Sequence, residues 1–193
     1  MPASWRRWAY GVALAACFLV PAARPVAAAD FAEPWEVGAY AVYTVYDNDT
    51  TISDTPGWGV RGGWQFKPRH AVELSFDTAS ADNSTKGSTI TFDIQRIRAD
   101  YLHNLKAKKP DSKLGAFILF GVGQMDYDNG TDSDSTTLFE TGGGLRILMT
   151  KKLALRFDGK IFHLHGDSVI IPRDAFYSFD FNAGVSFFFG QGK

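Results

Sequence analysis

The feature that most constrains the fold of this sequence is an alternation of apolar and polar residues with a period of two. From Tyr177 to Phe187, every odd-numbered residue is aromatic or apolar, and every even-numbered residue is polar or glycine. The segment from Leu153 to Ile161 repeats the pattern and places charged side chains at even positions. Successive residues of a strand point to opposite faces, so the pattern predicts strands with one apolar and one polar face.

Eight segments of this kind can be drawn along the chain, and most have the ~9–11 residues that a tilted membrane strand needs. Lipid accepts only the apolar face, so the polar face is expected to line the inside of a closed barrel. We therefore predict an all-β fold, an eight-stranded antiparallel up-and-down transmembrane β-barrel. Its expected strands are 35–46, 57–66, 69–78, 88–105, 113–126, 135–149, 152–165 and 175–189.

The segment 88–105 does not follow a single alternation. Its apolar residues are even-numbered up to Ile94 and odd-numbered from Ile97. A β-bulge near Gln95-Arg96 would restore one lipid-facing side. With such a bulge, Asp93 is expected to face the lumen.

The connections between the expected strands are of two kinds. The two kinds alternate along the chain, as they do in a barrel that has short turns in the periplasm and long loops outside. The short connections are 67–69, 107–112 and 150–152, and the long ones, rich in small polar residues, are 47–56, 79–87, 127–134 and 166–174.

The first 29 residues are predicted to be a secretory signal peptide. Arg6-Arg7 gives a positive start, residues 8–20 are apolar, and Ala27-Ala28-Ala29 provides a small-residue cleavage site. We expect cleavage after Ala29, which leaves residues 30–193 as the barrel domain in the outer membrane. Lipid attachment at Cys17 is the alternative.

Cleavage after Ala29 would change the charge and remove the single cysteine. The chain has 20 Lys and Arg against 21 Asp and Glu, and the three arginines lost with the signal leave a formal charge of −4. Without Cys17, disulfides and thiol catalysis are excluded. A mildly acidic chain is also a poor candidate for binding nucleic acid.

The segments Glu140 to Arg146, Leu153 to Asp158 and Phe181 to Phe187 also carry a family resemblance. With them the chain resembles the small outer-membrane β-barrel proteins of the OmpA-like, porin-family type. This implies a monomer with no cofactor, in contact with outer-membrane lipid and lipopolysaccharide and with the barrel-assembly machinery. The implied role is structural, surface-interacting or that of a minor porin. A lipid A-modifying enzyme and a lipocalin-like carrier are the alternatives.

The polar faces of the expected strands carry charges of both signs. An eight-stranded barrel is just wide enough for its interior to be filled by side chains, and an unpaired charge there is costly. We expect a structural ion-pair network that closes the lumen, with a narrow solute path as the alternative. Its expected members are Arg61, Glu73, Asp93, Arg98, Glu140, Arg146, Arg156, Asp158, Lys160 and Asp180, and the same face carries Glu36, Asp77 and Asp100.

Two other groups of residues invite a chemical reading. His163, His165 and Ser168 resemble the His and Ser of lipid A deacylase barrels, but a spacing of three places His165 and Ser168 on opposite faces of a strand. The acidic stretch 126–134 could coordinate calcium, but its glycine is not at the position that a calcium loop requires. We therefore expect no catalytic, cofactor or metal site.

Overall fold

The computed structural model describes residues 33–47, 52–85, 88–105, 112–131, 133–165 and 177–190. The expected signal peptide 1–29, its cleavage site after Ala29 and Cys17 lie outside these residues. None of the described residues belongs to a helix that is long and apolar enough to cross a membrane.

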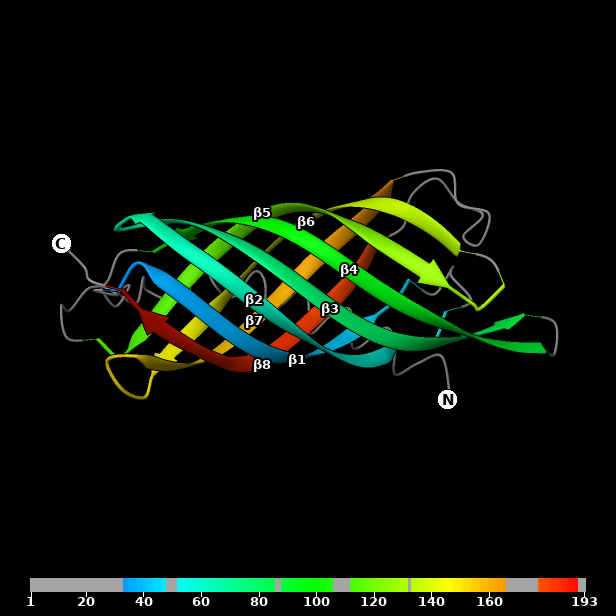
Figure 1. Ribbon diagram of the computed structural model, residues 1–193, viewed down its shortest axis with the longest axis horizontal. Coiled ribbons are helices and arrows are strands. Elements are labelled where there is room, and N and C mark those ends of the chain that lie inside the picture. The colour runs from blue at the N-terminus through cyan, green and yellow to red at the C-terminus, as the bar shows by residue number, and fades with distance from the viewer. Residues whose placement is uncertain are drawn as a thin grey trace.

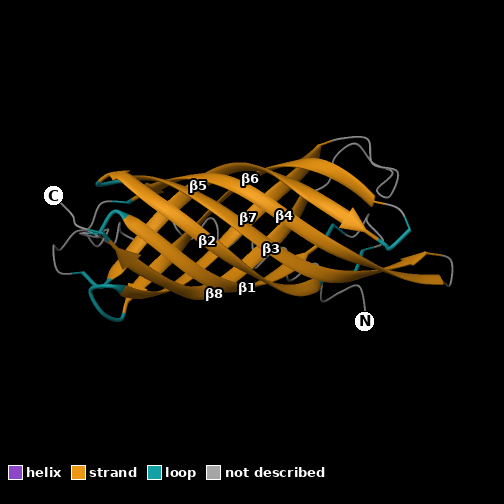
Figure 2. Ribbon diagram, in the orientation of Figure 1, coloured by secondary structure: helices purple, strands orange, loops and turns teal. Residues whose placement is uncertain are grey.

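The described chain forms eight strands in a closed barrel, which confirms the predicted fold (Figures 1 and 2). Each strand pairs antiparallel with the next, and β1 closes the barrel on β8. The strands are β1 Trp35–Val45, β2 Thr55–Lys67, β3 His70–Thr85, β4 Ser88–Asn104, β5 Leu114–Asp128, β6 Ser133–Leu148, β7 Leu153–His165 and β8 Tyr177–Phe189. We call the end with the connections after β2, β4 and β6 the turn end, and the opposite end the loop end.

The alternation of the sequence separates the two faces of the barrel wall. On β8, Phe181, Val185 and Phe187 are exposed, whereas Asp180 and Asn182 are buried inside. Aromatic rings gather on the outer surface near the turn end, where Trp35 and Trp64 stack with their centroids 5.9 Å apart. An apolar outer surface with aromatic rings near its edge is typical of a membrane-spanning barrel.

The expected β-bulge near Gln95-Arg96 is absent, which corrects the sequence interpretation. The ladder between β3 and β4 runs without a register shift from His70↔His103 to Thr85↔Ser88. Ile94 is therefore inside and 1% exposed, and Asp93 lies on the outer surface, where it accepts a 2.7 Å hydrogen bond from Ser80. Asp93 is thus not a lumen residue.

The physical reason is that the polarity of the two faces of β3–β6 is exchanged toward the loop end, while the side chains keep alternating between outside and inside. There the outer surface carries exposed polar residues such as Asp82, Gln124 and Asp126, and the inner surface is apolar. This arrangement is stable where water rather than lipid surrounds the barrel. The stretch 79–87, expected as a loop, accordingly continues β3 to Thr85, and β4 begins at Ser88. Figure 1 shows this β3–β4 hairpin extending past its neighbours.

Candidate functional site

The candidate site is the charged interior of the barrel. Thirteen charged side chains point inward, each at most 9% exposed and each in an ion pair. Nine of the ten residues expected in the lumen network are among them, and Arg96 takes the place of Asp93. Arg96 was missed because a bulge was expected beside it. Counting back from Arg98 in steps of two would have found it. The inward set is Glu36, Arg61, Glu73, Asp77, Arg96, Arg98, Asp100, Glu140, Arg146, Arg156, Asp158, Lys160 and Asp180.

Six of these residues form a turn-side network with three cations and three acids. Its centre is Arg156, which donates to Glu73 at 2.5 and 3.1 Å and to Asp158 at 2.9 Å. Arg61 reaches Asp158 from the far side of the lumen at 3.0 Å. The members are Glu36, Arg61, Glu73, Arg146, Arg156 and Asp158.

The other seven residues form a loop-side network with three cations and four acids. Arg98 pairs with Asp77, with Asp180 at 2.9 Å and with Glu140 at 3.3 Å. Lys160 lies between two carboxylates, 2.7 Å from Glu140 and 2.9 Å from Asp100. The members are Asp77, Arg96, Arg98, Asp100, Glu140, Lys160 and Asp180.

Tyr40 lies between the two networks and contacts both. Its hydroxyl donates to Asp77 at 2.9 Å and accepts from Arg98 at 3.0 Å, on the loop side. Its ring lies 4.2 Å from the guanidinium carbon of Arg61, on the turn side. The phenol therefore fills the level between the networks with a hydrogen bond at one edge and a cation–π contact on its face.

Apolar side chains occupy the lumen beyond each network. At the turn end, Phe117 packs against the guanidinium groups of Arg146 and Arg156, at 4.6 and 4.5 Å. We call the group Ala71, Leu102, Phe117 and Leu119 the turn-side apolar cluster. The loop-side apolar cluster is Tyr46, Ile52, Ala81, Phe92, Ile94, Met125, Tyr127, Leu138, Phe162 and Leu164.

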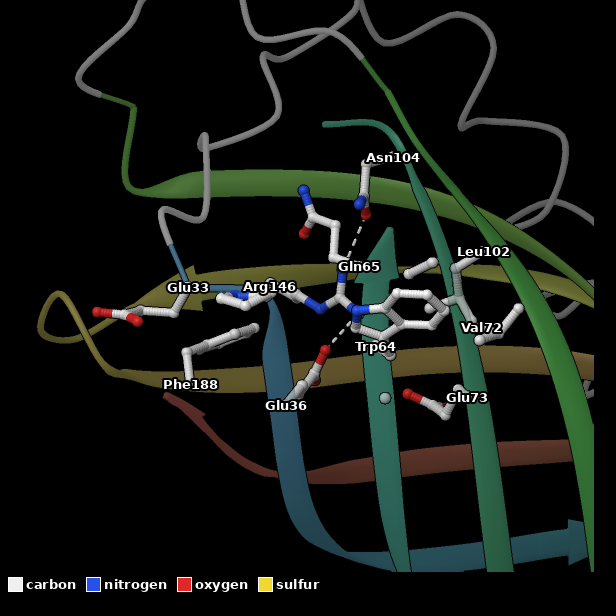
Figure 3. A pocket seen from close by; sticks show the side chains of 13 residues that line it. Glu33, Glu36, Trp64, Gln65, Val72, Glu73, Leu102, Asn104, Arg146 and Phe188 are labelled. Atoms are coloured by element: carbon white, nitrogen blue, oxygen red, sulfur yellow. Dashed lines mark hydrogen bonds and ion pairs between the residues drawn. The ribbon is translucent and has the colours of Figure 1, made fainter. Parts of the chain in front are cut away.

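A small pocket opens at the turn end, where Arg146 donates to Glu36 and to Asn104, both at 2.8 Å (Figure 3). Its free volume of about 10 Å³ is about the least that can hold one water molecule. The pocket is therefore too small for an organic ligand. Within the part of the chain that the structure describes, the lumen is filled in four levels: apolar, charged, charged and apolar.

The other sequence candidates do not converge on a reactive site. The ring of His163 packs against Tyr177 with centroids 5.0 Å apart. Ser168 and the side chain of His165 are outside the part of the chain that the structure describes. In the acidic stretch, Asp128 accepts a 2.7 Å bond from the backbone N–H of Gly130, whose φ is +80°. This is a turn stabilised by its own side chain. No three His, Cys, Asp or Glu side chains of the described residues are grouped to hold a metal ion.

Comparison with known proteins gives consistent matches. A family model described as outer membrane protein beta-barrel domain matches residues 11–189. The fold is similar to that of Neisserial surface protein A, with a TM-score of 0.62, 12% identity and coverage of 80% of this chain and 97% of that chain. It is also similar to OprG from Pseudomonas aeruginosa, with a TM-score of 0.50, 12% identity and coverage of 86% and 98%. None of the curated proteins compared with the sequence matches it.

Proposed function

The chain belongs to the outer membrane protein beta-barrel domain family, and from this premise we propose that it is a non-conducting barrel with a scaffold and surface-contact role. It is an integral protein of the outer membrane. The choice of role depends on the lumen and on the surface beyond the lipid.

The observation that carries this proposal is the filled lumen. A conducting barrel needs a continuous file of water, and here thirteen paired charges lie between two apolar clusters. An ion that entered would have to separate buried pairs such as Arg98–Asp180 and Lys160–Glu140. Removing a partner from a buried pair costs roughly 3–5 kcal/mol, so several such steps in series support a closed barrel.

The loop end supports the surface-contact part of the proposal. Strands β3–β6 carry polar residues on their outer surface there, and their inner surface is packed by the loop-side apolar cluster. This packed interior stabilises the part of the barrel wall that extends beyond the lipid. The exposed side chains Asp82, Asp93, Asp126 and Asp128 give this extension an acidic face. Such a face fits a contact with a basic partner at the cell surface.

Planar-bilayer conductance tests the proposal. Purified protein reconstituted into lipid should give no stepwise current, and the same sample should show different gel mobility before and after boiling, which reports an inserted barrel. Regular current steps from the wild-type protein would contradict the closed lumen. Absence of the mobility change, with recovery in buffer without detergent, would contradict membrane insertion itself.

We also propose that the protein is not an enzyme and that it is processed after Ala29. The spacing of His165 and Ser168 supports the first part, since a Ser–His pair must come within hydrogen-bond reach. Lipid A from cells that overproduce wild type or a Ser168→Ala variant should carry the same acyl chains. The signal pattern of residues 1–29 supports the second part, and N-terminal sequencing of the mature protein should begin at Asp30.

A further inference from the structure

The charges outside the lumen are divided between the two ends of the barrel. Every described Lys or Arg outside the lumen lies at the turn end: Lys67, Arg69, Lys113, Lys151 and Lys152. Every described Asp or Glu outside the lumen lies at the loop end, with the exception of Glu33. The described surface therefore has a basic turn end and an acidic loop end.

One part of the turn end combines basic charge with outward-facing histidines. The tight turn between β2 and β3 carries Lys67 and Arg69, both exposed. Just beyond it, His70 and His103 are direct partners across the β3–β4 ladder, and their rings lie 5.1 Å apart on the outer surface. We call Lys67, Arg69, His70 and His103 the basic rim.

Aromatic side chains fix the depth of the basic rim. Its histidine His70 bonds to the Tyr101 hydroxyl through Nδ1 and lies beside the Phe66 ring, which continues the row to Trp64. Trp and Tyr rings of this kind sit at the boundary between lipid tails and headgroups. The basic rim therefore lies where the phosphates of a membrane leaflet lie.

The chemistry of the basic rim suits a phosphate. His70 Nδ1 and the Tyr101 hydroxyl share a hydrogen bond, and in the tautomer in which the hydroxyl donates, Nε2 carries the ring proton and can donate to an anion. Arg69 can offer two parallel N–H donors, and Lys67 adds a point charge. No ion pair of the described residues joins Lys67 or Arg69 to an acid, so both charges are available to an anion.

We propose that the basic rim binds the headgroup phosphate of an anionic glycerophospholipid in the periplasmic leaflet of the outer membrane. The choice of leaflet rests on the proposed function, because it follows from a spanning barrel whose short turns face the periplasm. A basic group near an anionic leaflet is worth about 1 kcal/mol, or about fivefold in affinity. Two basic side chains together with the histidine donors give a local preference for a negatively charged lipid.

Native mass spectrometry of the barrel released from mixed phosphatidylcholine and phosphatidylglycerol nanodiscs tests this inference. The wild type should retain phosphatidylglycerol in excess over its share of the mixture. Lys67→Gln/Arg69→Gln should lower that excess by roughly 25-fold, at about fivefold per cation. His70→Phe keeps an aromatic ring beside Phe66 but removes the N–H donor, and should lower the excess by a smaller factor.

The matched control is Lys151→Gln/Lys152→Gln. It removes the same charge from the turn between β6 and β7, on the opposite side of the barrel and outside the basic rim. This control should keep most of the phosphatidylglycerol excess. Equal losses in both double variants would show diffuse charge attraction and overturn the site, as would a wild type that retains both lipids in proportion.

The heat-dependent gel shift in pure phosphatidylcholine separates this inference from the proposed function. All variants should show it, because the barrel needs no anionic lipid to insert. A normal shift without lipid preference would overturn the basic rim alone. Loss of the shift in the wild type would overturn the spanning barrel, and the inference with it.

Discussion

Arg96 and Asp77 face each other across the β3–β4 ladder, and Arg96 Nε donates to Asp77 Oδ1 at 2.5 Å inside the barrel. The same guanidinium reaches Asp180 at 3.0 Å and lies 5.6 Å from the centre of the Phe162 ring. Arg96 therefore joins the loop-side network to the loop-side apolar cluster. It marks the level at which the interior changes from charged to apolar.

The reversal of faces beyond Arg96 predicts opposite outcomes at two adjacent residues. Ile94 is 1% exposed within the loop-side apolar cluster, so Ile94→Asn should remove apolar burial and leave an amide without partners. We expect a loss of about 3 kcal/mol in the free energy of unfolding. Asp93→Asn, in water on the outer surface, should change it by less than about 0.5 kcal/mol. Urea unfolding in lipid vesicles measures both. A costly Asp93→Asn with a tolerated Ile94→Asn would restore the bulged arrangement.

The sequence predicted the number, order and approximate bounds of the strands, because a period of two marks each strand and polar segments separate one strand from the next. It could not place Asp93, because a change of parity has two physical causes. One cause is a bulge, which turns the following side chains to the other face. The other is that the strand leaves the lipid, so that its outer face must be polar and its inner face apolar. In water, Ile94 gains by facing inward and Asp93 by facing outward. Only the unbroken ladder to β3 distinguishes the two causes.

Lys160 is predicted to be the most sensitive cation of the loop-side network. Among the described residues, Lys160 is the only cation that forms an ion pair with Asp100, whereas Glu140 also pairs with Arg98. Lys160→Met leaves Asp100 as a buried charge with no cation and should cost roughly 3–5 kcal/mol.

Combining Lys160→Met with Asp100→Asn provides the control, because the second change removes the stranded charge. The double variant should unfold at higher urea than the single Lys160→Met variant. If instead the two losses simply add, the side chains are not coupled and the described pair is not important for stability.

The identity of the ion pairs could be predicted less well than the list of charges. Arg61 and Asp158 are 97 residues apart and meet at 3.0 Å across the lumen. Their contact depends on the stagger of all the strands around the closed barrel. Alternation assigns each residue to a face, but it does not fix the height at which a side chain crosses the lumen. The central place of Tyr40 could not be foreseen for the same reason.

Two glycines of the β6–β7 wall should respond differently to one added methyl group. At Gly144, facing the lumen, a Cβ would lie 2.7 Å from Phe117 Cζ and 2.7 Å from Asp158 Cβ. Gly144→Ala should therefore lower the free energy of unfolding by ~1–3 kcal/mol through overpacking. At Gly159, no heavy atom lies within 4 Å of such a Cβ, so Gly159→Ala should be neutral or slightly stabilising. A Gly144→Ala variant as stable as Gly159→Ala, again by urea unfolding in vesicles, would mean that the lumen is looser than described.

Membrane placement itself predicts a depth series on the outer face of β8. Val185 and Phe181 share this face two residues on either side of the middle of the strand, and Tyr177 lies at its first residue; they are 47, 43 and 59% exposed. An arginine near the bilayer midplane costs ~2–4 kcal/mol, and the cost falls to ~0–1 kcal/mol at the interface. Val185→Arg and Phe181→Arg should therefore be similarly damaging and Tyr177→Arg nearly neutral, as measured by reversible unfolding in vesicles. Val185→Leu, which keeps an apolar contact with lipid, should stay close to wild type. The contrast between the middle and the end of the strand matters more than any one value, because all three residues are exposed and only surrounding lipid makes depth important. Equal effects at the three positions would mean that water surrounds the whole strand, and the spanning barrel would lose its physical basis.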